Sequence, residues 1–215
     1  MDWDRLVETL RDAVGAEPLP SVSEVAAQSR DPFRILVSTM ISLRTKDEVT
    51  TAASRRLFAL ADDPASMAAL ETNEIAQAIY PAGFYNTKAE NIRAASSIIV
   101  AEHGGRTPNT LDALTGLPGV GRKTANLVLG LGFAIPSICV DTHVHRIPNR
   151  WGVVDTTTPE KTEHALMEIL PERYWIEING LLVAFGQRVC TPQSPRCSKC
   201  PLASECRKVG VKRSR

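Results

Sequence analysis

The chain has 215 residues, with 25 Lys and Arg against 24 Asp and Glu, a formal net charge of +1, and 43% hydrophobic residues. These proportions are typical of globular proteins and exclude a disordered chain, a collagen-like chain and a nucleic-acid-binding protein of extreme charge. The length suffices for one or two domains with a hydrophobic core. The charge is unevenly spread, because residues 188–215 hold eight Lys or Arg and one acidic residue.

We expect no secretory signal, because the first residues do not form a basic segment followed by an apolar core. The longest stretch of weakly polar residues, 127–140, is interrupted by glycine and proline and is too short to span a membrane. We therefore expect a soluble intracellular protein of the cytoplasm or nucleoid, with no membrane partner. In such a compartment, disulfides are the less expected use of the five cysteines.

The hydrophobic pattern is helical almost throughout. Apolar side chains at positions 3, 6, 7, 10 and 14 follow a helical stripe that ends at Gly15. Helix starts are predicted at the capping boxes Ser21–Glu24, Thr45–Glu48 and Thr87–Glu90, and at Thr158 before a proline. Residues 33–43 are apolar on nearly every face, which predicts a buried central helix. Strand patterns are missing, so we predict an all-α protein.

A glycine-rich turn leads into a helix at residues 117–125, which read LPGVGRKTA. Gly119 and Gly121 allow a close approach of the backbone, and a helix N-terminus favours a bound phosphate. A plain connector between two helices is the alternative for a lone pair of glycines. The full string resembles the helix-hairpin-helix motif, which positions proteins on the DNA backbone without reading bases.

Two ionisable residues near this turn are candidates for catalysis. Lys123 is predicted in the first helical turn beside Arg122, a position that favours the neutral amine needed for Schiff-base chemistry. Asp141 follows an apolar segment and is predicted to cap a helix that begins at Thr142. A carboxylate held there could also stabilise a positively charged sugar. His143 and His145 are two residues apart and form a poor metal pair, so we expect local bonds for them.

Four cysteines lie in the basic C-terminal segment with the spacing C-x6-C-x2-C-x5-C, at Cys190, Cys197, Cys200 and Cys206. Four thiolates can hold zinc or an iron–sulfur cluster. Zinc is the weaker interpretation, because zinc ribbons usually contain two C-x2-C pairs and one is present. Cys139 stands apart and is predicted to be a small core residue.

These motifs, together with GFYNTKAEN at residues 83–91, resemble the endonuclease III family of DNA glycosylases over nearly the whole chain. The resemblance implies a six-helix barrel domain with the helix-hairpin-helix at residues 24–135. It also implies an iron–sulfur domain at residues 1–23 and 136–215, with the active site in the cleft between the two. It implies a monomer that acts on double-stranded DNA containing damaged bases or abasic sites. The four cysteines would then hold a [4Fe-4S] cluster.

The resemblance also implies residue roles. Lys123 would attack C1′ of the damaged nucleotide and Asp141 would assist, with strand cleavage by β-elimination. The implied DNA-binding residues are Ser42, Arg44, Asp47, Phe84, Tyr85, Asn86, Gly119, Gly121, Arg122, His143, Arg196 and Lys199. Ordinary packing is an equal alternative for Phe84 and Tyr85. Arg44 stands where the family commonly has glutamine, and Phe84 replaces the more usual leucine, so the preferred lesion and opposite base stay open.

The implied activity is a bifunctional glycosylase and lyase for oxidised pyrimidines. A monofunctional mismatch glycosylase is one alternative, although such relatives typically lack a lysine at the Lys123 position. A non-catalytic module that binds damaged DNA is the other.

Overall fold

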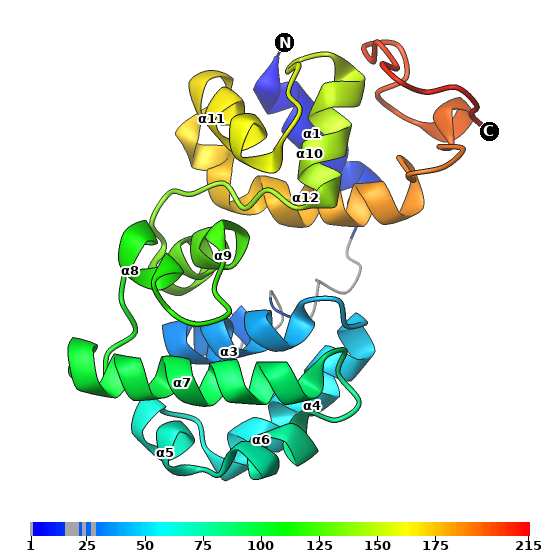
Figure 1. Cartoon of the computed structure of the whole chain (residues 1–215). Coiled ribbons are helices and arrows are strands. Elements are labelled where there is room, and N and C mark those ends of the chain that lie inside the picture. The colour runs from blue at the N-terminus through cyan, green and yellow to red at the C-terminus, as the bar shows by residue number, and fades with distance from the viewer. Residues whose placement is uncertain (1, 16–21, 23–24, 27–28) are drawn as a thin grey trace. The chain divides into compact units, whose positions relative to one another are not determined.

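The fold is described by a computed structural model for residues 2–15, 22, 25–26 and 29–215. Every regular element in this part of the chain is a helix, which confirms the predicted all-α class (Figure 1). Within the same residues, each helix is either too short or too polar to cross a lipid bilayer.

The chain forms two compact units, and each has its own hydrophobic core. Unit 1 combines Met1–Leu19 with Pro136–Arg215, and unit 2 is Pro20–Ile135. The ranges expected from the sequence, 24–135 and 1–23 with 136–215, remain a prediction, because the first cut falls among residues outside the described part.

Unit 2 is built around a buried helix. Its helices are α3 (Pro32–Ser42), α4 (Asp47–Leu60), α5 (Pro64–Ala69), α6 (Thr72–Ile79), α7 (Tyr85–His103), α8 (Leu111–Thr115) and α9 (Arg122–Phe133). Helix α3 packs against α4, α7 and α9, and α7 packs against α5 and α6 (Figure 1). All residues of α3 from Ile35 to Ile41 are buried, as the apolar pattern predicts.

Two predicted helix starts in unit 2 are wrong. Helix α4 begins at Asp47 without a side-chain cap, and the Thr45 hydroxyl instead accepts a hydrogen bond from Gly83 N at 3.1 Å. Thr87 lies inside α7, which begins directly after Phe84, a residue with the left-handed φ of 58°. At Thr45 a tertiary contact overrides the local capping pattern. The third predicted start, Ser21–Glu24, lies outside the described residues.

Unit 1 is a set of helices packed on α12. It contains α1 (Trp3–Val14), α10 (Thr142–Trp151), α11 (Pro159–Ile169), η1 (Glu172–Tyr174), α12 (Trp175–Arg188) and η2 (Cys197–Lys199). Helix α12 packs against α1 and α10 (Figure 1). The predicted stop at Gly15 and the predicted cap at Thr158 are confirmed, since Thr158 accepts a bond from Lys161 N. Cys139 is buried, as expected.

Candidate active and DNA-binding sites

The glycine-rich turn joins α8 to α9 as a helical hairpin. Gly119 has a φ of +74°, and a β-carbon there would lie 2.7 Å from Asn91 Nδ2. Gly121 is the N-cap of α9, has extended backbone angles and makes no side-chain cap bond. A β-carbon at Gly121 would meet no protein atom within 4 Å. The start of α9 is therefore open on the side of Gly121, which is what a phosphate bound to helix N–H groups requires.

Lys123 lies in the first turn of α9 and is exposed to solvent. Its neighbour Arg122 is half-buried. The chain geometry therefore presents the amine of Lys123 outward at the same helix end that is open to an anion.

Asp141 is the N-cap of α10 in unit 1, as predicted. Its Oδ1 accepts hydrogen bonds from the backbone N–H groups of His143 and Val144, both at 2.8 Å. Because both cap bonds use Oδ1, Oδ2 takes no part in the cap. The structural role of Asp141 thus coexists with a carboxylate oxygen that other chemistry can use.

The two histidines of the VDTHVH segment make local contacts, as expected. His145 Nδ1 lies 2.6 Å from Thr162 Oγ1, and His143 Nδ1 lies 3.0 Å from Arg146 Nη2. The His143 ring fills the space where a side chain at residue 186 would go, which explains the glycine there. Arg146 also donates to the carbonyl of Cys190 at 2.8 Å, and burial lowers its pKa from the ordinary arginine value.

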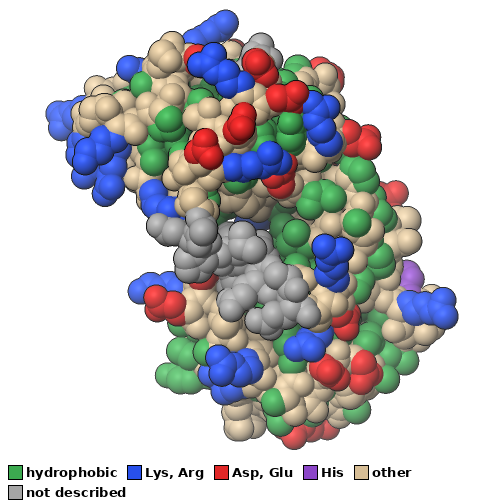
Figure 2. Space-filling view, turned by 180° about the vertical axis from the view of Figure 1, so that it is seen from behind, with side chains coloured by type: hydrophobic (Ala, Val, Ile, Leu, Met, Phe, Trp, Pro, Cys, Tyr) green, Lys and Arg blue, Asp and Glu red, His purple; other side chains and the backbone are tan. Residues whose placement is uncertain are grey.

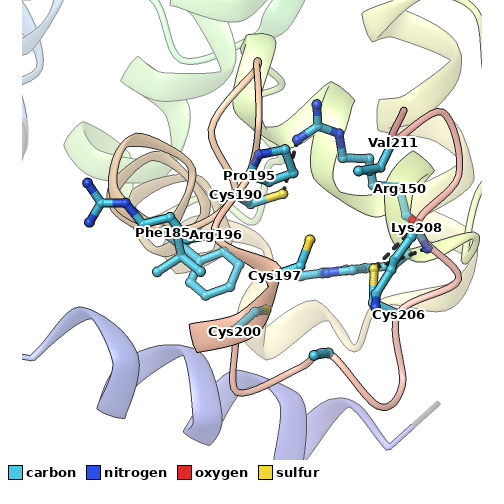
Figure 3. A pocket seen from close by; sticks show the side chains of 13 residues that line it. Arg150, Phe185, Cys190, Pro195, Arg196, Cys197, Cys200, Cys206, Lys208 and Val211 are labelled. Atoms are coloured by element: carbon cyan, nitrogen blue, oxygen red, sulfur yellow. Dashed lines mark hydrogen bonds between the residues drawn. The ribbon is translucent and has the colours of Figure 1, made fainter. Parts of the chain in front are cut away.

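The four clustered cysteines line one pocket, and their sulfur atoms are visible in Figure 3. The rest of the lining includes Phe185, Pro195 and Val211. Cys190, Cys197, Cys200 and Cys206 are all free thiols and half-buried. Burial raises the pKa of Cys200 and Cys206, so these thiols stay protonated unless a cationic centre takes the place of the proton.

The donor set is one that can hold an iron–sulfur cluster, because such clusters are bound by cysteine thiolates. Among the described residues, no group of three or more His, Cys, Asp or Glu side chains is arranged to hold one metal ion. Zinc binds sulfur at about 2.3 Å and needs thiolates drawn together around one point. Four thiols that surround a pocket suit a larger multi-iron group held by cysteine alone.

Arg150 bonds the cysteine loop to α10 within unit 1. Its Nη1 donates to the Thr191 carbonyl at 2.7 Å and lies 3.4 Å from Cys190 Sγ, and its Nη2 donates to the Pro192 carbonyl at 2.6 Å. These bonds fix Cys190 and the two residues that follow it. A guanidinium beside the sulfur also offsets the negative charge that four thiolates bring.

Basic side chains surround this loop. Arg196 and Lys199, both predicted to contact DNA, are exposed. Lys and Arg side chains gather at the edge of unit 1 where the C-terminal segment lies (Figure 2). A surface of this kind attracts a phosphate backbone irrespective of base sequence.

Apart from Gly119, Gly121 and Arg122 of the helical hairpin, the residues predicted to contact DNA in unit 2 lie on two neighbouring segments. Arg44 and Phe84 are exposed, and the Arg44 guanidinium carbon lies 5.6 Å from the centre of the Phe84 ring. Tyr85 is half-buried and packs edge-on against Tyr80, with ring centres 5.4 Å apart. Packing therefore accounts for Tyr85 and leaves Phe84, which is 64% exposed, without a core role. The other three predicted contacts there are Ser42, whose hydroxyl donates to the Thr39 carbonyl, and the exposed Asp47 and Asn86.

Lys88, a buried lysine in the first part of α7, was not among the residues predicted for the site. Its side chain makes three hydrogen bonds to the segment that carries Arg44. One signal was available: Lys88 begins the stripe that continues at Ile92, Ala95 and Ile99, so a lysine occupies an apolar helix position. Arg146 and Arg150 were also missed, and no local pattern marks their contacts with residues about 40 positions away.

Comparisons with known proteins agree with this geometry. Residues 37–172 match the HhH-GPD superfamily of base excision DNA repair proteins. Endonuclease III of Thermotoga maritima is 51% identical over 176 residues, which are 82% of this chain and 83% of that protein. The solved structure of a trapped covalent endonuclease III–DNA intermediate has a TM-score of 0.80 and 30% identity, and covers 97% of each chain.

A thermostable thymine-DNA glycosylase, 24% identical with a TM-score of 0.82 over 95% of each chain, shares the fold. The matched family covers more than half of the chain, and the relative from Thermotoga maritima exceeds the similarity at which family membership is secure. The chain therefore belongs to the endonuclease III family of HhH-GPD base excision repair DNA glycosylases.

Proposed function

We propose that this glycosylase is bifunctional and removes oxidised pyrimidines from double-stranded DNA through a Schiff base on Lys123. The observation that carries the proposal is the exposed amine of Lys123 in the first turn of a helix whose N-terminus is open to a phosphate. The N–H groups that would bind a DNA phosphate and the amine of Lys123 thus lie within one helical turn. The related endonuclease III whose structure holds a trapped covalent intermediate with DNA supports a covalent route.

The first step would be attack of neutral Lys123 Nζ on C1′ of the damaged nucleotide. The C1′–N bond breaks, and the base leaves with the bonding electrons and takes up a proton. Asp141 would stabilise the positive charge that develops on the sugar, using the oxygen that its helix cap leaves over. The C1′–O4′ bond of the resulting aminal then breaks, O4′ takes up a proton, and the opened sugar is left as a Schiff base with Lys123. This Schiff base acidifies the C2′ proton, and loss of that proton expels the 3′ phosphate by β-elimination.

The cysteine loop would hold a [4Fe-4S] cluster through Cys190, Cys197, Cys200 and Cys206. When bound, such a cluster supplies a rigid centre that folds the basic loop, together with a site charge that is negative overall. Arg150 is placed to hold the first ligand and the chain after it. Arg196 and Lys199 would then face DNA phosphates.

Borohydride trapping tests the chemistry. The wild-type enzyme mixed with duplex DNA containing thymine glycol, or an abasic site, should give a covalent adduct that Lys123→Ala abolishes. Lys161→Ala is the matched control, because Lys161 is also an exposed lysine in a first helical turn. An undiminished adduct in Lys123→Ala would refute the assignment.

Substrate class is tested by a panel of duplexes under single-turnover conditions. Release of oxidised pyrimidines with strand cleavage supports the proposal. Release of adenine or thymine from mismatches without cleavage would instead identify a monofunctional enzyme. Tight binding with no release from any duplex would identify a binding module.

A further inference from the structure

Lys88 presents a buried ammonium group whose protons are all used. Lys88 is 8% exposed. Nζ donates to the carbonyls of Ile41 and Leu43, both at 2.6 Å, and to Thr45 Oγ1 at 2.9 Å. An ammonium has three N–H donors, and each has an acceptor here.

These acceptors lie where α3 ends. Helix α3 stops at Ser42, and the carbonyls of its last turn carry partial negative charge. An ammonium placed on them stabilises the helix end and holds the residues that follow it. Lys88 is therefore bonded to the backbone on both sides of Ser42.

Thr45 extends this contact to a second segment. Its Oγ1 accepts from Lys88 Nζ and also from Gly83 N at 3.1 Å. The two segments touch closely, because a β-carbon at Gly83 would lie 2.6 Å from the carbonyl oxygen of Arg44. One hydroxyl group thus joins residues 43–45 to the turn before α7.

Each joined segment contains a strained residue. Arg44 has a φ of +54° and Phe84 a φ of +58°, and both are larger than the residues that tolerate this region. Such angles persist where surrounding contacts determine them. Here they orient two exposed side chains toward each other, with the Arg44 guanidinium over the Phe84 ring.

We propose that Lys88 is a positioning residue that acts through Thr45 to present Arg44 and Phe84 together before DNA binds. The inference rests on the proposed function, and it assigns to Arg44 and Phe84, both predicted DNA contacts, the task of filling the space left by the extruded nucleotide. Extrusion costs a few kcal/mol, and a preset pair of side chains offsets part of that cost on contact. Lys88 is not a second nucleophile, because its three protons are engaged and its side chain is buried.

The test compares Lys88→Met, which keeps the length and removes the ammonium, with Lys46→Met. Lys46 is exposed in the same loop and makes no cap bond, so it controls for the loss of one positive charge. Loss of a hydrogen bond to a charged group corresponds to about a tenfold change in a rate or equilibrium constant. The single-turnover rate of thymine glycol release should therefore fall about tenfold in Lys88→Met. With enzyme in excess, Lys46→Met should match the wild type.

A spectroscopic readout separates positioning from general stability. A 2-aminopurine placed opposite the lesion brightens when it is unstacked, so insertion should give a smaller rise in Lys88→Met than in the wild type. Cleavage at a preformed abasic site should change much less, because no base has to leave the stack. Equal loss of both reactions, or wild-type fluorescence and release in a folded Lys88→Met, would overturn the proposal.

A second variant keeps the test valid if Lys88→Met does not fold. Thr45→Val keeps the side-chain volume and removes the hydroxyl that joins the two segments, and it should lower the same fluorescence rise. Unchanged fluorescence in Thr45→Val would overturn the proposal in that case. The fluorescence rise does not depend on bond cleavage, so it can be measured in Lys123→Ala, in which no Schiff base is expected. Failure of this inference can therefore be distinguished from failure of the proposed function.

Discussion

Replacing Gly119 with alanine should destabilise the protein through two effects that the structure quantifies. The residue has a φ of +74°, and an added β-carbon would lie 2.7 Å from Asn91 Nδ2 and 3.0 Å from Asn91 Cβ. The left-handed backbone costs an alanine about 1–2 kcal/mol, and displacing a packed side chain adds about 1 kcal/mol. We expect the free energy of unfolding to fall by about 2–3 kcal/mol, or about 4–12 °C in melting temperature for a chain of this length.

Gly121→Ala is the matched variant, because its φ is −93° and its β-carbon would meet no protein atom. Its stability should be unchanged or slightly raised, since alanine restricts the unfolded chain by about 0.4–1 kcal/mol more than glycine does. The methyl group would instead stand at the open start of α9, where a phosphate is expected. Binding to a duplex with an uncleavable abasic analogue should therefore weaken.

Thermal unfolding followed by circular dichroism measures the first effect, and titration of the labelled duplex at several salt concentrations measures the second. A Gly119→Ala protein as stable as the wild type would refute the packing argument. A Gly121→Ala protein that binds DNA as tightly as the wild type would show that no phosphate sits on the N-terminus of α9.

The remaining predictions concern the carboxylate, the cysteines and the buried lysine. Asp141→Ser should keep the helix cap and the melting temperature yet lose base release, whereas Asp141→Ala should also lose about 1 kcal/mol of stability; base release by the serine variant would contradict the catalytic role. Cys200→Ser should lose bound iron, about four atoms per chain in the wild type, and Cys139→Ser should retain it; elemental analysis decides, and iron loss in both would reverse the assignment. Burial lowers the pKa of Lys88 from 10.5 to about 8, so between those values the folded chain releases a proton that the unfolded chain still binds. The stability of the wild type relative to Lys88→Met should therefore rise by about 3 kcal/mol from pH 8 to pH 10.5, and a difference that stays constant in denaturant titrations would exclude the shifted pKa.

Helix positions were predictable wherever the controlling interaction is local. The stripe that ends at Gly15, the cap at Thr158 and the cap at Asp141 all depend on residues within four positions of each other, and all three are confirmed. The capping box at Thr45 failed because that hydroxyl bonds with Gly83 and Lys88, about 40 residues away. A pattern of four residues contains no information about such partners.

For the candidate site, too, prediction succeeded where the pattern is local and failed where the contacts are distant in sequence. The four cysteines were predicted from their spacing to form one site, and they line one pocket. The contacts of Lys88 were not predictable from the sequence, because its acceptors lie 43–47 positions earlier in the chain. Its position on an apolar helix stripe indicates burial. The buried charge is explained by hydrogen bonds to the end of α3, which the sequence pattern does not show.

Unit 2 contains three features that work against stability, and they occur at one place. A buried ammonium is costly, and the left-handed φ angles of Arg44 and Phe84 each cost a non-glycine residue about 1 kcal/mol or more. For stability alone, glycine would suit positions 44 and 84. Arg30 and Ala134 of unit 2 also have left-handed φ angles, but Arg44 and Phe84 are the two that are predicted to contact DNA, so we expect their geometry to serve binding rather than folding. Glycine at positions 44 and 84 should therefore raise the free energy of unfolding and lower the rate of base release. Substitutions at core positions such as Leu57 or Ile92 should instead lower the free energy of unfolding.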